Sequence, residues 1–238
     1  MAQAGTTARI DMKKAMTVAE LAAHFDHTLL KAFAQKTDFE KLCRDSADYG
    51  FKMVAINSTP VKLCKELLKG TDVRVGAAIS FPLGQTSLSI KVREAEQAIA
   101  DGADEIDYVI NIGRMKEGDV DYIKKEMQAI VELCRQSNTT SKIIFETCYL
   151  TPQEIKIVAG IAREVGPDFI KTSTGFGTAG ATVENVRLMK DTVGERVKVK
   201  ASGGIRDLET CLAMIEAGAE RIGSSSSIEI VEAYKKTL

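Results

Sequence analysis

Short runs of apolar and β-branched residues alternate with longer amphipathic stretches from residue 25 to the end of the chain. This alternation is typical of parallel βα units, in which each strand is followed by a covering helix. The pattern predicts eight strands, over residues 25–30, 53–57, 73–80, 105–110, 142–147, 168–173, 197–202 and 220–223.

The stretches between these runs carry the signals of helix ends. Residues 87–103 place apolar side chains at helical spacing and stop near Gly102. Thr151 followed by Pro152 predicts an N-cap and a first helical position, and residues 207–218 end on a glycine. Residues 17–24 predict an additional helix before the first strand.

Eight βα units in 238 residues match a closed barrel, which typically has ~250 residues. An open doubly wound sheet usually has fewer units and a G-x-G-x-x-G first turn, which residues 30–35 lack. We therefore predict an α/β protein, a (β/α)8 TIM barrel with an extra N-terminal helix. No Pro/Ser-rich linker interrupts the series, so we expect one catalytic domain over 17–238 after a flexible extension over 1–16. Reactive side chains should lie at the C-terminal ends of the strands.

Composition sets limits on the partners of this chain. Its 32 basic and 33 acidic residues give a formal net charge of -1, so no overall field favours nucleic acid or a membrane surface. No apolar run approaches the ~20 residues of a membrane span. The five cysteines lack metal-binding spacing, which favours a reducing cytoplasm and predicts neither a metal nor another cofactor.

Two lysines stand out because each lies near the end of a predicted strand. Alternation along a strand places Lys171 on one face with Phe169 and Ser173, and Lys200 on one face with Ser202. A buried ammonium must be paired, deprotonated or used chemically, because its transfer from water is unfavourable. A nearby cation makes Lys171 easier to deprotonate, and a neutral amine can attack a carbonyl.

The same alternation selects interior carboxylates. Asp107 lies opposite Ile106 and Tyr108, Asp26 lies on the inner face of the first strand, and Glu146 is a further candidate on the fifth. Lys198 shares the inward parity of Lys200, and we expect it to extend toward the bottom rim.

An anion site is predicted at the last two units. Gly203-Gly204 and the run 223–227 supply unhindered backbone N–H groups and hydroxyls beside a helix N-terminus, and the loop 172–180 can close over the same anion. Taken alone, the glycines are also compatible with a tight turn and the serines with a helix cap.

Several ordered motifs resemble one known family. At residues 25–31, 103–107, 145–147, 169–175, 199–206 and 221–225, the chain is similar to the deoxyribose-phosphate aldolase family of class I aldolases. The resemblance covers nearly the whole chain after residue 17 and implies a (β/α)8 barrel.

The resemblance also implies reversible cleavage of 2-deoxy-D-ribose 5-phosphate to acetaldehyde and D-glyceraldehyde 3-phosphate, in deoxyribose phosphate catabolism. The Schiff-base lysine of the family falls on Lys171, the second lysine on Lys200, the proton-relay aspartate on Asp107 and a supporting aspartate on Asp26. We also expect a homo-oligomer, either a dimer or a tetramer. The family's phosphate site falls on Gly175, Gly203, Gly204, Ser225 and Ser226.

Two residues differ from the pattern of the family, and three others are not expected to take part in the reaction. Ala55 stands where many relatives have a cysteine, and Tyr234 lies inside the last predicted helix rather than in a tail that transfers protons. His24, His27 and Cys148 are expected to be structural.

The alternative functions are those of another phosphate-handling barrel, either an isomerase or a metal-dependent aldolase, and of a non-catalytic sugar-phosphate-binding barrel. With two histidines and no ligand cluster, a metal mechanism is disfavoured.

Overall fold

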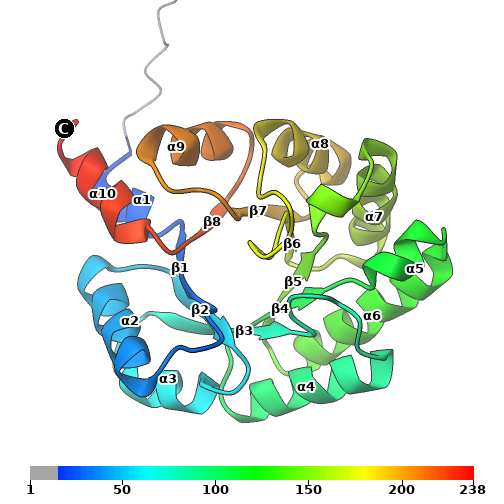
Figure 1. Ribbon diagram of the computed structural model, residues 1–238, viewed down its shortest axis with the longest axis horizontal. Coiled ribbons are helices and arrows are strands. Elements are labelled where there is room, and N and C mark those ends of the chain that lie inside the picture. The colour runs from blue at the N-terminus through cyan, green and yellow to red at the C-terminus, as the bar shows by residue number, and fades with distance from the viewer. Residues whose placement is uncertain (1–15) are drawn as a thin grey trace, which may run out of the picture.

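The computed structural model describes residues 16–238, which form a closed barrel of eight parallel strands surrounded by helices (Figure 1). Each strand pairs with the next along the chain, and β8 pairs with β1 to close the barrel. The strands are β1 (Phe25–Leu29), β2 (Met53–Asn57), β3 (Arg74–Ile79), β4 (Glu105–Val109), β5 (Thr140–Ile144), β6 (Phe169–Lys171), β7 (Lys198–Ser202) and β8 (Arg221–Ser224).

Helices cover the outside of this barrel, and the predicted fold is confirmed. They are α1 (Val18–Ala22), α2 (Lys36–Tyr49), α3 (Val61–Leu67), α4 (Leu88–Ala100), α5 (Ile112–Lys116), α6 (Val120–Gln136), α7 (Pro152–Val165), α8 (Val183–Val193), α9 (Leu208–Glu216) and α10 (Ser227–Lys235), with a 3-10 turn, η1 (Thr147–Tyr149), after β5. None of those helices is long and apolar enough to cross a bilayer.

The extra N-terminal helix is α1, which packs beside α10 (Figure 1). Thr17 and Glu20 form a capping box at its start. The predicted extension over 1–16 lies outside the described residues except for Met16, whose carbonyl accepts a hydrogen bond from the Tyr234 hydroxyl at 2.5 Å. Tyr234 lies within α10, as expected.

Local signals account for most helix starts. Thr151 and Asp207 accept hydrogen bonds from backbone N–H groups three residues later, at the starts of α7 and α9. The βα unit after β4 differs from the prediction because it contains two helices, α5 and α6, where one was expected. Gly118, with φ +76°, turns the chain between them, and Asp119 caps α6.

Alternation along the strands separates two environments. The outward-facing side chains of β4 and β7 are apolar and fully buried against the helices, as with Ile106, Tyr108 and Val199. Burying a side chain of this kind contributes about 1.5–3 kcal/mol relative to leaving it exposed. The inward-facing side chains of the same strands include Asp107 and Lys200, so the apolar outer layer holds a charged interior in place.

Candidate active site

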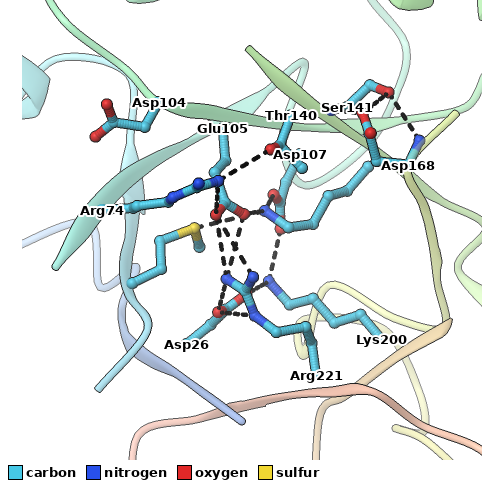
Figure 2. A network of polar contacts seen from close by, with 12 residues as sticks. Asp26, Arg74, Asp104, Glu105, Asp107, Thr140, Ser141, Asp168, Lys200 and Arg221 are labelled. Atoms are coloured by element: carbon cyan, nitrogen blue, oxygen red, sulfur yellow. Dashed lines mark hydrogen bonds and ion pairs between the residues drawn. The ribbon is translucent and has the colours of Figure 1, made fainter. Parts of the chain in front are cut away.

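Seven charged side chains meet inside the barrel, and all of them are buried. Figure 2 shows Asp26, Asp107, Lys200 and Arg221 converging from different strands. Three carboxylates face four basic groups, so the positive charges are largely neutralised within the network. The seven residues are Asp26, Glu105, Asp107, Lys142, Lys171, Lys200 and Arg221.

Asp107 is the centre of this network. Its Oδ2 lies 2.9 Å from the Lys171 Nζ and 2.7 Å from the Lys200 Nζ, and its Oδ1 lies 2.7 Å from the Lys142 Nζ. Burial opposes ionisation of this carboxyl, but the three lysines outweigh it and hold the pKa of Asp107 well below its ordinary value. Asp107 is therefore an anion that links the two predicted lysines.

Lys171 loses its proton more easily than Lys200. Burial lowers the pKa of Lys171 to about 8, with the Lys200 charge acting in the same direction and Asp107 opposing both. Burial contributes more to this shift than the neighbouring cation that the sequence pointed to. At pH 7 about a tenth of the amine is then neutral.

Lys200 behaves in the opposite way because it has two carboxylate partners. Its Nζ lies 2.5 Å from Asp26 Oδ2 and 2.7 Å from Asp107 Oδ2. Burial would lower the pKa of Lys200, but these partners raise it above its ordinary value. Asp26 is itself held by Arg221, whose Nε donates to Oδ1 at 2.7 Å. Lys200 therefore stays a cation while Lys171 can be neutral.

Sequence reasoning missed Lys142, Glu105 and Arg221. The signal was available, because Lys142 alternates with Ile143 and Glu105 has the same parity as Asp107. Lys142 forms ion pairs with both Glu105 and Asp107, and Arg221 bridges Asp26 and Glu105. By occupying Oδ1 of Asp107, Lys142 leaves Oδ2 to the other two lysines.

Lys198 lies outside this network. It is the first residue of β7, its side chain is exposed, and its Nζ lies 5.6 Å from the centre of the Phe169 ring. Because strands begin at the bottom of the barrel, this position agrees with the expected place at the lower rim.

A cavity of about 580 Å³ opens over the C-terminal ends of the strands and reaches Lys171 and Lys200. Its lining includes four of the predicted phosphate residues, Gly175, Gly203, Gly204 and Ser225. Ser226 is the N-cap residue of α10, beside Ser225, and does not line the cavity. Basic side chains not singled out from the sequence also line it, namely Lys31, Lys41 and Arg206.

The loops at this rim need glycine for steric reasons. Gly175, Gly203 and Gly204 have φ values of 88°, 84° and 79°, a conformation that other residues rarely adopt. A Cβ on Gly180 would lie 2.1 Å from the Gly203 carbonyl oxygen. The two loops can therefore approach this closely only because residue 180 is a glycine. Exposed backbone groups are thereby brought beside two lysines, an arrangement suited to an anion.

The other candidates are not members of the charged network, although Lys171 lies near enough to Glu146 for its charge to oppose the rise in pKa that burial gives this carboxyl. Glu146 is buried just after β5, and its carboxylate accepts from the Thr174 backbone N–H at 3.2 Å. Cys148 places its Sγ 3.8 Å from Glu146 Oε1. His27 is buried against Phe51, with ring centroids 5.1 Å apart, and the His24 Nδ1 lies 2.8 Å from the Glu20 carbonyl oxygen. In residues 16–238 no group of three or more His, Cys, Asp or Glu side chains could hold a metal ion.

The fold and the interior together define a (β/α)8 barrel in which buried lysines and carboxylates lie beside a cavity at the C-terminal ends of the strands. Residues 15–230 match the model of the DeoC/LacD family aldolases, and the chain belongs to this family. It is therefore an aldolase, a carbon–carbon lyase.

Named relatives resemble the chain over most of their length. It is 55% identical over 219 residues to a deoxyribose-phosphate aldolase of Lactobacillus acidophilus, covering 92% of each chain. It is 53% identical over 221 residues to one of Bacteroides thetaiotaomicron, covering 93% of each. The solved tetrameric deoxyribose phosphate aldolase of Aeropyrum pernix superposes with a TM-score of 0.87 at 30% identity, covering 93% of this chain and 94% of that one.

Proposed function

We propose that the protein reversibly cleaves 2-deoxy-D-ribose 5-phosphate into acetaldehyde and D-glyceraldehyde 3-phosphate through a Schiff base on Lys171, in deoxyribose phosphate catabolism. The observation that carries this proposal is the position of Lys171: its amine is buried, has a pKa of about 8 and shares Asp107 with a second, charged lysine. The names of the relatives support the substrate.

In the proposed reaction, neutral Lys171 attacks C1 of the open-chain sugar, and the carbinolamine loses water to give an iminium ion. The iminium withdraws electrons as the C2–C3 bond breaks, and the C3 hydroxyl loses its proton. D-Glyceraldehyde 3-phosphate leaves, and the enamine takes a proton at C2. Water then releases acetaldehyde and restores the amine.

Asp107 and Lys200 are suited to the proton transfers in this sequence. Both lie within hydrogen-bond reach of each other, and Asp107 also contacts the Lys171 Nζ, where protons are lost and gained. Asp26 supports them by pairing with Lys200. The positive charge of Lys200 also disfavours protonation of Lys171 before attack.

The substrate phosphate is proposed to bind at the rim formed by the β6–α8, β7–α9 and β8–α10 loops. Gly175, Gly203, Gly204 and Ser225 line the cavity there, and Ser226 caps α10 beside them. Backbone N–H groups at a helix start favour an anion. Arg206 lines the same side of the cavity and adds positive charge.

We further propose a homo-oligomer, a dimer or a tetramer, that works in the cytoplasm. The Aeropyrum pernix relative is described as tetrameric. All five cysteines are free thiols, which suits a reducing compartment.

Trapping the intermediate tests this function directly. Incubation with acetaldehyde and borohydride should add the mass of C2H4 per chain, because an ethyl group replaces one hydrogen of the amine and the reduced imine is a stable secondary amine. Peptide mapping should place it on Lys171. An adduct on Lys200 alone would refute the assignment of the nucleophile, and no adduct would favour the non-catalytic sugar-phosphate-binding barrel.

A further inference from the structure

We propose that Glu146 is a positioning residue that holds the phosphate-binding turn around Gly175, so that phosphate affinity depends on a carboxylate outside the phosphate cavity. The inference rests on the proposed function, because it concerns the same phosphate. Glu146 does not line the large cavity. It lies on the other side of the β6–α8 loop, in a second cavity of about 290 Å³ with Tyr149 and Phe176.

The backbone at Glu146 has an unusual conformation that its neighbours enforce. Its φ and ψ of 55° and 63° place it in the left-handed region, which residues other than glycine seldom adopt. Backbone hydrogen bonds fix the chain on both sides, from the Phe145 N–H to the Lys171 carbonyl and from the Thr147 N–H to the Thr172 carbonyl, each at 2.9 Å. The end of β5 is therefore tied to the end of β6, with the Glu146 side chain between them.

The carboxylate binds one residue of the β6–α8 loop through several hydrogen bonds. Thr174 N–H donates to Glu146 Oε1 and Oε2 at 3.2 and 3.3 Å, and the Thr174 hydroxyl donates to Oε2. The same hydroxyl accepts from the Phe176 N–H at 3.0 Å. These bonds span Gly175, so both neighbours of the proposed phosphate residue are connected to Glu146.

Close packing supports this attachment. A Cβ on Gly177 would lie 2.6 Å from the Cys148 Sγ and 3.1 Å from the Glu146 Cδ, so the loop rests directly on the turn after β5. At its other end the loop is tied to the end of β7, because the Ala181 N–H donates to the carbonyl of Ser202, the last residue of that strand, at 3.1 Å. The Gly175 turn is thus held from both sides, and Glu146 supplies the side-chain contact on the β5 side.

A carboxylate suits this position because both of its oxygens accept, and the Thr174 N–H and hydroxyl donate to them. An amide in its place keeps one oxygen acceptor for these two donors. The Thr174 hydroxyl must then lose its acceptor or rotate to accept from the amide, and the less tightly held turn can sample other conformations. Ordering the turn on binding would then weaken phosphate affinity, while the ion pairs of Lys171 and Lys200 with Asp107 stay in place.

The test compares Glu146→Gln, which keeps the side-chain shape, and Glu146→Gly, which keeps the left-handed turn, in the full chain. Binding of inorganic phosphate is measured by calorimetry, and kinetics are measured with 2-deoxy-D-ribose 5-phosphate and 2-deoxy-D-ribose. We expect about tenfold weaker phosphate binding and an about tenfold higher KM for the phosphorylated sugar, with kcat changed less than about threefold. For the sugar without phosphate, kcat/KM should change less than about twofold.

Two variants of Thr174, the hydrogen-bond partner of Glu146, keep the test decisive if a Glu146 variant does not fold. Thr174→Ser keeps the hydroxyl and should bind phosphate like the parent, whereas Thr174→Val should bind it as weakly as Glu146→Gln. Glu164→Gln removes an exposed carboxylate on α7 that pairs with Lys124, and it should change nothing.

Three results would overturn the proposal: unchanged phosphate affinity in Glu146→Gln, an equal loss for both sugars, or no phosphate binding by the parent protein. A parent that binds phosphate through a Glu146-dependent turn but cleaves neither sugar would refute the proposed function and leave the positioning role standing.

Discussion

Between residues 16 and 238 the protein buries lysine–carboxylate pairs in two regions, and only one of them opens to the large cavity. Inside the barrel, Lys171 contacts Asp107 and opens to the large cavity. Outside the barrel wall, Lys91 of α4 and Glu126 of α6 form a pair at 2.6 Å with both side chains fully buried. Burial lowers the pKa of Lys91 just as it lowers that of Lys171.

The two lysines differ in their partners and in their access. The Lys91 Nζ also donates to the Val109 carbonyl at 2.6 Å and lines neither described cavity. Glu126 accepts from the Asn111 N–H at 3.0 Å, so this pair joins two helices to the end of β4. A buried lysine with a lowered pKa therefore does not by itself indicate a candidate active site. Lys171 also reaches a cavity and shares its carboxylate with a second lysine.

Removing the interior amine should have the largest effect. We expect Lys171→Leu to lower kcat/KM for 2-deoxy-D-ribose 5-phosphate by at least about 10³-fold, because no covalent intermediate can form. Asp107 keeps two lysine partners, so the unfolding temperature should change little. Steady-state kinetics and thermal unfolding check both parts. Retained turnover would show that Lys171 is not the nucleophile.

Removing the outer amine should affect stability and not chemistry. Lys91→Met leaves Glu126 buried without its partner, and we expect a loss of about 3–5 kcal/mol in the free energy of unfolding. Denaturant titration measures this loss. In the protein that remains folded, kcat/KM should stay within about threefold of the parent. A far larger loss of kcat/KM at unchanged stability would remove the distinction between the two regions.

The pH dependence should give the smallest effect. Because neutral Lys171 is the reactive form, kcat/KM should rise with pH and level off above the pKa of about 8. Lys142 is a further positive charge that lowers the pKa of Lys171, so Lys142→Met should move the midpoint to higher pH. Profiles of kcat/KM between pH 6 and 10 test both statements, with pH 8 to 9 decisive. A midpoint that stayed fixed or fell would contradict the electrostatic account of the interior.

Much of the fold and part of the site could be predicted because they depend on local pattern. Strand alternation identified Lys171, Lys200 and Asp107 as inward-facing, and their contacts confirm that placement. It could equally have identified Lys142 and Glu105, which were overlooked although the same rule applies. The strands β5 and β6 were predicted to end at residues 147 and 173 but end at Ile144 and Lys171. The chain turns after β5 at Glu146, whose left-handed conformation periodicity does not reveal.

The sequence by itself determined the number of βα units, the capped helix starts and the parity of each strand residue, since these follow from side chains near one another in the chain. The tertiary structure alone decided that Lys142 donates a hydrogen bond to Asp107, that Glu126 reaches Lys91 and that Glu146 binds Thr174. It also decided that the pKa of Lys171 is lowered while that of Lys200 is raised. Such contacts join residues far apart in the chain, and a pKa sums burial and every nearby charge, so neither can be obtained from local pattern.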